Sequence, residues 1–60
     1  MDEIKIRIMS LVLEVIQTRG TDYVLDYSYM STKIEEWIKS NLIPKDEAYK
    51  VFQCINSLRN

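Results

Sequence analysis

The chain has 60 residues, of which 47% are hydrophobic and 28% charged, with a single glycine and a single proline. This composition is typical of a folded globular protein and excludes disordered and collagen-like chains. At this length we expect one helical domain spanning residues 1–60. Eight basic and nine acidic residues give a net charge of −1, too balanced to attract nucleic acid or an anionic membrane by charge alone.

The cysteine content and the N-terminus bear on the cellular compartment. Cys54 is the single cysteine, so an internal disulfide framework, the usual support of small secreted domains, is excluded. The N-terminus is acidic, and no apolar run approaches the roughly 18 residues of a membrane span. We therefore expect a cytoplasmic protein without a membrane partner.

Residues 2–19 are predicted to form the first helix. Asp2 and Glu3 stand where the helix dipole favours negative charge, and Arg19 followed by Gly20 is a typical helix end. At 100° per residue, the apolar side chains cover an arc of roughly 220°. They are Ile4, Ile6, Ile8, Met9, Leu11, Val12, Leu13, Val15 and Ile16.

That arc is wider than the stripe of about 100° that an ordinary surface helix buries. We therefore expect two neighbouring helices, or one neighbour and a second copy of the chain, to cover it. An alternative interpretation takes the alternation over residues 4–8 as a β-strand that ends in a hairpin turn at residues 17–21. The helix is favoured because the pattern becomes helical after Met9 and no turn signal interrupts it.

The second helix is expected within residues 22–41. Its large side chains recur at intervals of four and three residues, which predicts one continuous helix. These side chains are Tyr23, Tyr27, Met30, Ile34 and Trp37. A different start near Ser31 is also open, because Thr32 and Glu35 form a capping-box pattern.

A third helix is expected after Pro44, which excludes helical backbone from the residue before it and suits the first turn of the next helix. Its apolar face comprises Ala48, Val51, Phe52, Ile55 and Leu58. The predicted fold class is all-α: a small three-helix bundle, or a helical hairpin plus a helix, completed by dimerisation.

Catalytic and metal-binding patterns are missing from the sequence. There is no histidine, and one cysteine cannot build a zinc site within one chain. Cys54 falls at the edge of the third apolar stripe, where a half-buried structural cysteine is expected. We therefore predict a protein that is not an enzyme and that binds no metal and no cofactor.

The leading functional hypothesis is a protein–protein interaction module that self-associates, binds a larger protein as an inhibitor or adaptor, or does both. Small chains of this kind include phage-encoded inhibitors. Aromatic side chains are enriched at interface hot spots. The candidate partner-binding residues are therefore Tyr23, Tyr27, Tyr29, Trp37 and Tyr49. For Tyr27, Trp37 and Phe52, filling of the core is the competing interpretation.

Two further hypotheses stay open. A nucleic-acid-binding dimer resembling a helix-turn-helix protein would use the polar side chains of the third helix. These are Lys45, Lys50, Gln53 and Asn56, with Asp46 and Glu47 opposing phosphate binding. A small-molecule pocket lined by Tyr27, Met30 and Trp37 is the other.

Overall fold

The computed structural model describes residues 2–59, and its regular structure over that range is entirely helical. The elements in chain order are α1 (Glu3–Arg19), α2 (Thr21–Val24), α3 (Tyr27–Lys39), the 3-10 helix η1 (Lys45–Glu47) and α4 (Tyr49–Arg59). The all-α prediction is confirmed. The strand alternative for residues 4–8 is wrong, because these residues lie within α1. Four α-helices and a 3-10 turn take the place of the three helices expected.

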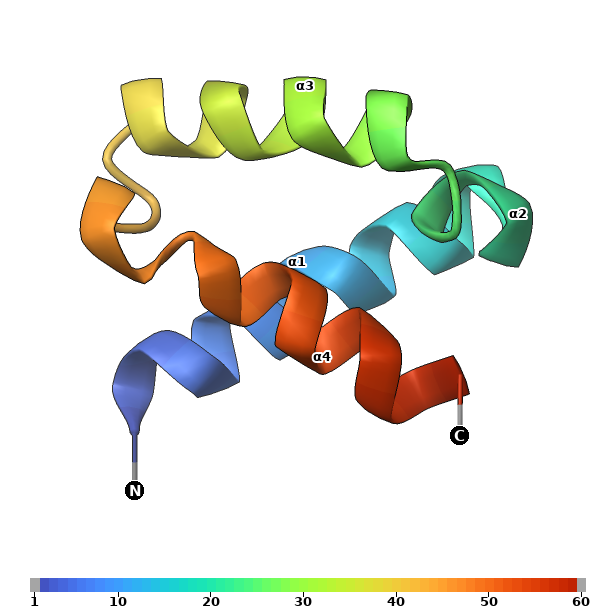
Figure 1. Ribbon diagram of the computed structural model, residues 1–60, viewed down its shortest axis with the longest axis horizontal. Helices are drawn as coiled ribbons and strands as arrows, with labels where there is room; N and C mark the ends of the chain where they lie inside the picture. The colour runs from blue at the N-terminus through green and yellow to red at the C-terminus, as the bar shows by residue number, and fades with distance from the viewer. Residues whose placement is uncertain (1, 60) are drawn as a thin grey trace.

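The molecule has two layers (Figure 1). α3 forms one layer, and α1 and α4 cross each other in the second layer. The single turn α2 forms the corner between α1 and α3, while η1 leads from the loop after α3 into α4. The first and last helices of the chain therefore form one layer and pack together.

Both ends of α1 follow from the residues predicted to set them. The Asp2 carboxylate accepts hydrogen bonds from the backbone N–H groups of Ile4 and Lys5, at 3.0 and 3.3 Å, and so caps the first turn. At the other end, the N–H of Gly20 donates to the carbonyl of Ile16 at 2.9 Å. Gly20 has φ of 98°, a left-handed conformation that glycine adopts without strain.

The region between α1 and α3 differs from the continuous second helix that we predicted. α2 ends at Val24, and the backbone becomes extended at Asp26. The Asp26 carboxylate begins a new helix by accepting a hydrogen bond from the N–H of Tyr29 at 3.0 Å. Thr32 does not cap a helix start, because its hydroxyl donates to the Ser28 carbonyl within α3. The second helix was predicted to start at residue 22 or near Ser31, and both predictions are wrong. The carboxylate of Asp26 caps a new helix here, which competes with continuation of the preceding one.

α3 ends in a turn that returns the chain towards α4. Asn41 has φ of 60°, and the N–H of Leu42 donates to the carbonyl of Trp37 at 2.9 Å, so the last turn of the helix is closed. Pro44 is extended and precedes η1, which confirms the predicted break. The guanidinium of Arg7 donates to the Leu42 carbonyl at 3.0 Å, and this bond ties the turn to α1.

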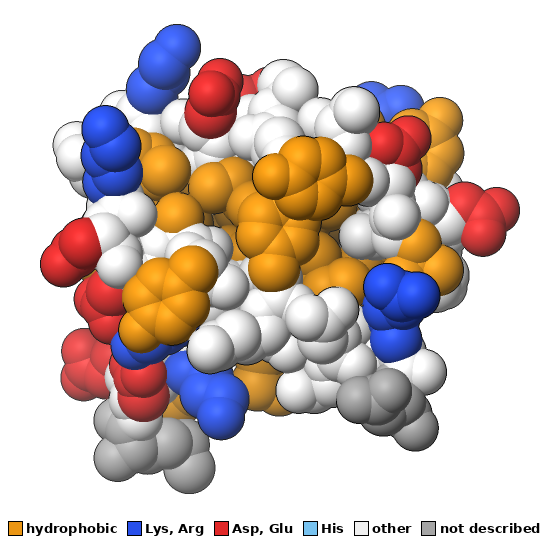
Figure 2. Space-filling view, viewed as in Figure 1, with side chains coloured by type: hydrophobic (Ala, Val, Ile, Leu, Met, Phe, Trp, Pro, Cys, Tyr) orange, Lys and Arg blue, Asp and Glu red, His pale blue; other side chains and the backbone are white. Residues whose placement is uncertain are grey.

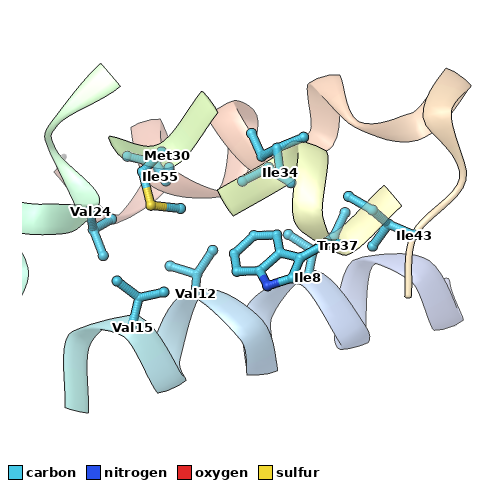
Figure 3. Packing of buried hydrophobic residues seen from close by; sticks show 10 residues of the cluster. Ile8, Val12, Val15, Val24, Met30, Ile34, Trp37, Ile43 and Ile55 are labelled. Carbon is cyan, nitrogen blue, oxygen red and sulfur yellow. The ribbon is translucent and has the colours of Figure 1, made fainter. Parts of the chain in front are cut away.

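The hydrophobic core lies between the two layers. Figure 3 shows Trp37 extending from α3 to α1, where its indole ring lies beside Ile8 and Val12. Ile8, Met30 and Val51 are fully buried, each contributed by a different helix. The complete cluster is Ile8, Val12, Val15, Val24, Met30, Ile34, Trp37, Ile43, Val51 and Ile55. Only one face of α1 thus enters the core.

Two isoleucines of α1 allow a test of this packing. Ile8 is 0% exposed, whereas Ile6 is 46% exposed. We expect Ile8→Ala to lower the free energy of unfolding by about 2–5 kcal/mol, because it removes buried methyl groups and leaves a cavity. Ile6→Ala should change it by less than about 1 kcal/mol. Urea unfolding followed by circular dichroism at low protein concentration measures both values, and equal losses would contradict the assigned faces of α1.

The cap of α3 can be tested separately. Asp26→Ala should destabilise the protein by about 0.5–2 kcal/mol, because the N–H of Tyr29 loses its acceptor. Asp22→Ala is the matched control, since it removes the same charge from α2 without touching the cap. If the two variants unfold at the same urea concentration, Asp26 does not set the start of α3.

Candidate functional site

The outer face of α1 carries apolar side chains that the core leaves exposed. Ile6, Met9 and Leu13 are 46%, 53% and 52% exposed. They follow each other at intervals of three and four residues, so they form one stripe along the helix. The inner half of the predicted arc is buried, and this outer half faces away from the core.

α4 extends this stripe into a groove. Leu58, which is 57% exposed, and the half-buried Cys54 lie along one side of Ile6, Met9 and Leu13. The groove has a volume of about 510 Å³. We call it the α1–α4 groove, and its lining consists of Ile6, Met9, Ser10, Leu13, Cys54 and Leu58. Ser10 brings the only side-chain hydroxyl to this lining, so the surface favours apolar contact.

Cys54 contributes an apolar wall rather than a reactive group. Partial burial raises the pKa of its thiol, and the nearby charge of Lys5 opposes this rise only in part. The thiol therefore stays protonated at neutral pH, whereas nucleophilic cysteines depend on the thiolate. The expected half-burial of Cys54 is confirmed.

A second apolar surface lies between α3 and α4. The rings of Tyr27 and Phe52 stack with centroids 5.2 Å apart and an interplanar angle of 17°. Apolar side chains gather between these two helices on the face shown in Figure 2. Tyr27 is 72% exposed, so it covers Phe52 from the solvent side and does not fill the core. We call this pair and the neighbouring Leu25 the Tyr27 patch.

The predicted partner-binding aromatics do not meet in one site. Trp37 is 6% exposed and belongs to the core, whereas Tyr49 is exposed at the start of α4. Tyr23 and Tyr29 contact each other edge to face, with ring centroids 4.9 Å apart. The expected small-molecule pocket is not formed by its three residues, because Met30 and Trp37 are buried and Tyr27 lies on the surface.

The groove residues were absent from our list of partner-binding candidates. The prediction rests on residue type, and aliphatic side chains such as Ile6, Leu13 and Leu58 carry no hot-spot signature of their own. The signal that could have found the stripe was the width of the apolar arc on the first helix. The contribution of α4 depends on tertiary packing.

Of the residues proposed for nucleic-acid binding, Lys50 is engaged by acidic groups. Its ammonium lies 3.0 Å from a carboxylate oxygen of Asp2 and 2.6 Å from one of Glu47. The hydrogen bonds that Lys50 donates to Glu47 and to Asp2 raise its pKa. The hydrogen bond from Lys50 also lowers the pKa of Asp2. Lys45, Gln53 and Asn56 are exposed. The two carboxylates beside Lys50 therefore oppose the approach of a phosphate.

The next question is whether the described residues could bind a metal ion or cross a membrane. Among residues 2–59, no group of three or more histidine, cysteine, aspartate or glutamate side chains is arranged to hold a metal ion. Within the same range, no helix has the length and apolar character needed to cross a membrane.

Comparisons with family models, with curated proteins and with solved structures returned no match to this chain. We therefore infer function from the geometry and chemistry of the described residues.

The contact between Asp2 and Lys50 predicts a pH dependence of stability. Folding lowers the pKa of Asp2 from 3.8, so its stabilising effect is complete above about pH 3.8 and disappears as the pH falls through the lower, folded pKa. Lys50→Gln should weaken this acid dependence, because the largest cause of the lowered pKa is lost. Lys33→Gln, which removes the exposed pair with Glu36, is the control. Urea unfolding across the acid range measures the effect, and identical profiles for the natural chain and Lys50→Gln would contradict it.

Proposed function

We propose that this protein is a non-enzymatic protein–protein interaction module that binds its partner through the α1–α4 groove. The observation that carries the proposal is the half-exposed stripe Ile6, Met9 and Leu13, extended by Leu58. On a small monomer, clustered apolar side chains of this kind mark interaction sites more often than single exposed ones do.

The shape of the groove supports a helical partner. A stripe with intervals of three and four residues is the geometry by which two α-helices pack their side chains together. Apolar grooves between two helices bind an amphipathic helix through residues at those same intervals. The almost entirely apolar lining means that burial of surface, rather than charge, would supply the binding energy.

The Tyr27 patch is a weaker candidate for the same role. The rings of Tyr27 and Phe52 already stack on each other, so a partner could bury only the outer face of the Tyr27 ring. The nucleic-acid alternative is weaker again, because Lys50 is paired with Asp2 and Glu47. Within residues 2–59, only Lys45 of the two proposed lysines has no ion pair.

An affinity capture tests the proposed function. The tagged chain is incubated with native lysate, with and without nuclease, and bound proteins are identified by mass spectrometry. We expect one protein to bind the natural chain stoichiometrically, with or without nuclease. It should not bind Leu13→Lys, because the lysine charge in the groove would have to be desolvated on binding.

Thr18→Lys is the matched control. Thr18 is exposed on α1, about 140° around the helix from Leu13, and a lysine in the C-terminal part of a helix is well tolerated. This variant should capture the partner like the natural chain. Capture that is unchanged in Leu13→Lys, or that disappears with nuclease, would refute the groove as the binding surface.

A further inference from the structure

We propose that the occupant of the α1–α4 groove is a second copy of this chain, with α1 of the two copies packed antiparallel about a two-fold axis. This inference rests on the proposed function and specifies its partner. The axis would pass between Met9 and Ser10, at the middle of the exposed stripe.

The size of the core gives the first argument for self-association. The structure buries a cluster of 10 apolar side chains in a chain of 60 residues. A core this small rarely supplies more than about 3–5 kcal/mol without a disulfide, a metal or an oligomer. The single cysteine excludes an internal disulfide, and no metal-binding cluster occurs among residues 2–59. Burial of the exposed stripe against a second copy would add apolar contact to this small core.

The stripe is suited to contact with itself. Ile6 and Leu13 lie at equal distances along α1 from the point midway between Met9 and Ser10. A two-fold axis at that point would place Ile6 of each chain against Leu13 of the other, which is the self-complementary arrangement of an isologous interface. Ser10 is small and lies at the centre of the contact, where it lets the two helices approach closely.

Charge selects the antiparallel direction. In a parallel pair, Asp2 and Glu3 of one chain would lie beside the same two acidic residues of the other, and like charges repel. In the antiparallel pair, Glu3 comes close to the neutral Gln17 of the second copy. This arrangement also sets the N-terminus of each α1 beside the C-terminus of the other, so opposite ends of the helix dipoles are paired.

The exposed area predicts a weak dimer. Ile6, Met9, Leu13 and Leu58 are 46%, 53%, 52% and 57% exposed. Four partly exposed side chains form a small contact compared with the about 800 Å² per partner of a standard interface. Because association also costs translational and rotational freedom, we expect a micromolar or weaker dissociation constant and a concentration-dependent dimer.

Sedimentation equilibrium of the purified full chain tests the dimer. The mass should rise with concentration from 7.1 kDa towards twice that value. Leu13→Lys should weaken association about tenfold or more, which corresponds to about 1.4 kcal/mol or more. Thr18→Lys should associate like the natural chain. A mass that stays at 7.1 kDa at all concentrations, or a dimer that Leu13→Lys leaves intact, would overturn the proposal.

Disulfide trapping tests the direction of the two helices. In a Cys54→Ala background, chains carrying Ile6→Cys are mixed with chains carrying Leu13→Cys and oxidised with diamide. The antiparallel arrangement predicts several-fold more cross-linked dimer in the mixture than in either variant alone, because Cα atoms must approach within about 7 Å. Stronger cross-linking of each variant with itself would indicate a parallel pair and overturn the proposal.

Sedimentation and affinity capture together can refute the proposed dimer without refuting the proposed function. If the chain is monomeric but Leu13→Lys abolishes capture of another protein, the second copy is the wrong occupant and the groove remains the binding surface. If the chain is monomeric and captures nothing, both fail. A dimer lost in Leu13→Lys and trapped between positions 6 and 13 supports both.

Discussion

All the packing in this protein depends on one face of α1. Ile8, Val12 and Val15 form one side of the core, and buried side chains of α3 and α4 pack against them. A single helix of 17 residues must therefore hold together a chain with no covalent cross-link within it. Because the hydrophobic effect scales with buried apolar area, the contacts of the other helices with that face contribute directly to stability.

The helical class could be predicted because its signals are local. Asp2 and Gly20 set the two ends of α1, and Pro44 sets the break before α4, each through its own backbone or capping chemistry. The corner at residues 25–26 was missed because the spacing of the large side chains continues across it. Tyr27 matches the helical interval, but its ring stacks on Phe52 at the surface instead of entering the core.

The candidate site could be predicted only in part. The width of the apolar arc indicated that one side of the first helix would lack a cover, but which side depends on where α4 crosses α1. The same tertiary placement decides that Trp37 is buried and that Lys50 meets Asp2, 48 positions away. Contacts between residues so far apart leave no trace in the spacing of one sequence.

The layer formed by α1 and α4 also determines when the core can close during synthesis. α1 is translated before α4, which packs beside it. At about 5–20 residues per second, the 40 residues that follow α1 to the end of α4 take roughly 2–8 seconds to emerge. During that interval α4 is absent, so apolar side chains on both the inner and the outer face of α1 are less covered than in the folded protein. The nascent chain therefore passes through a period in which chaperone binding or premature pairing competes with folding.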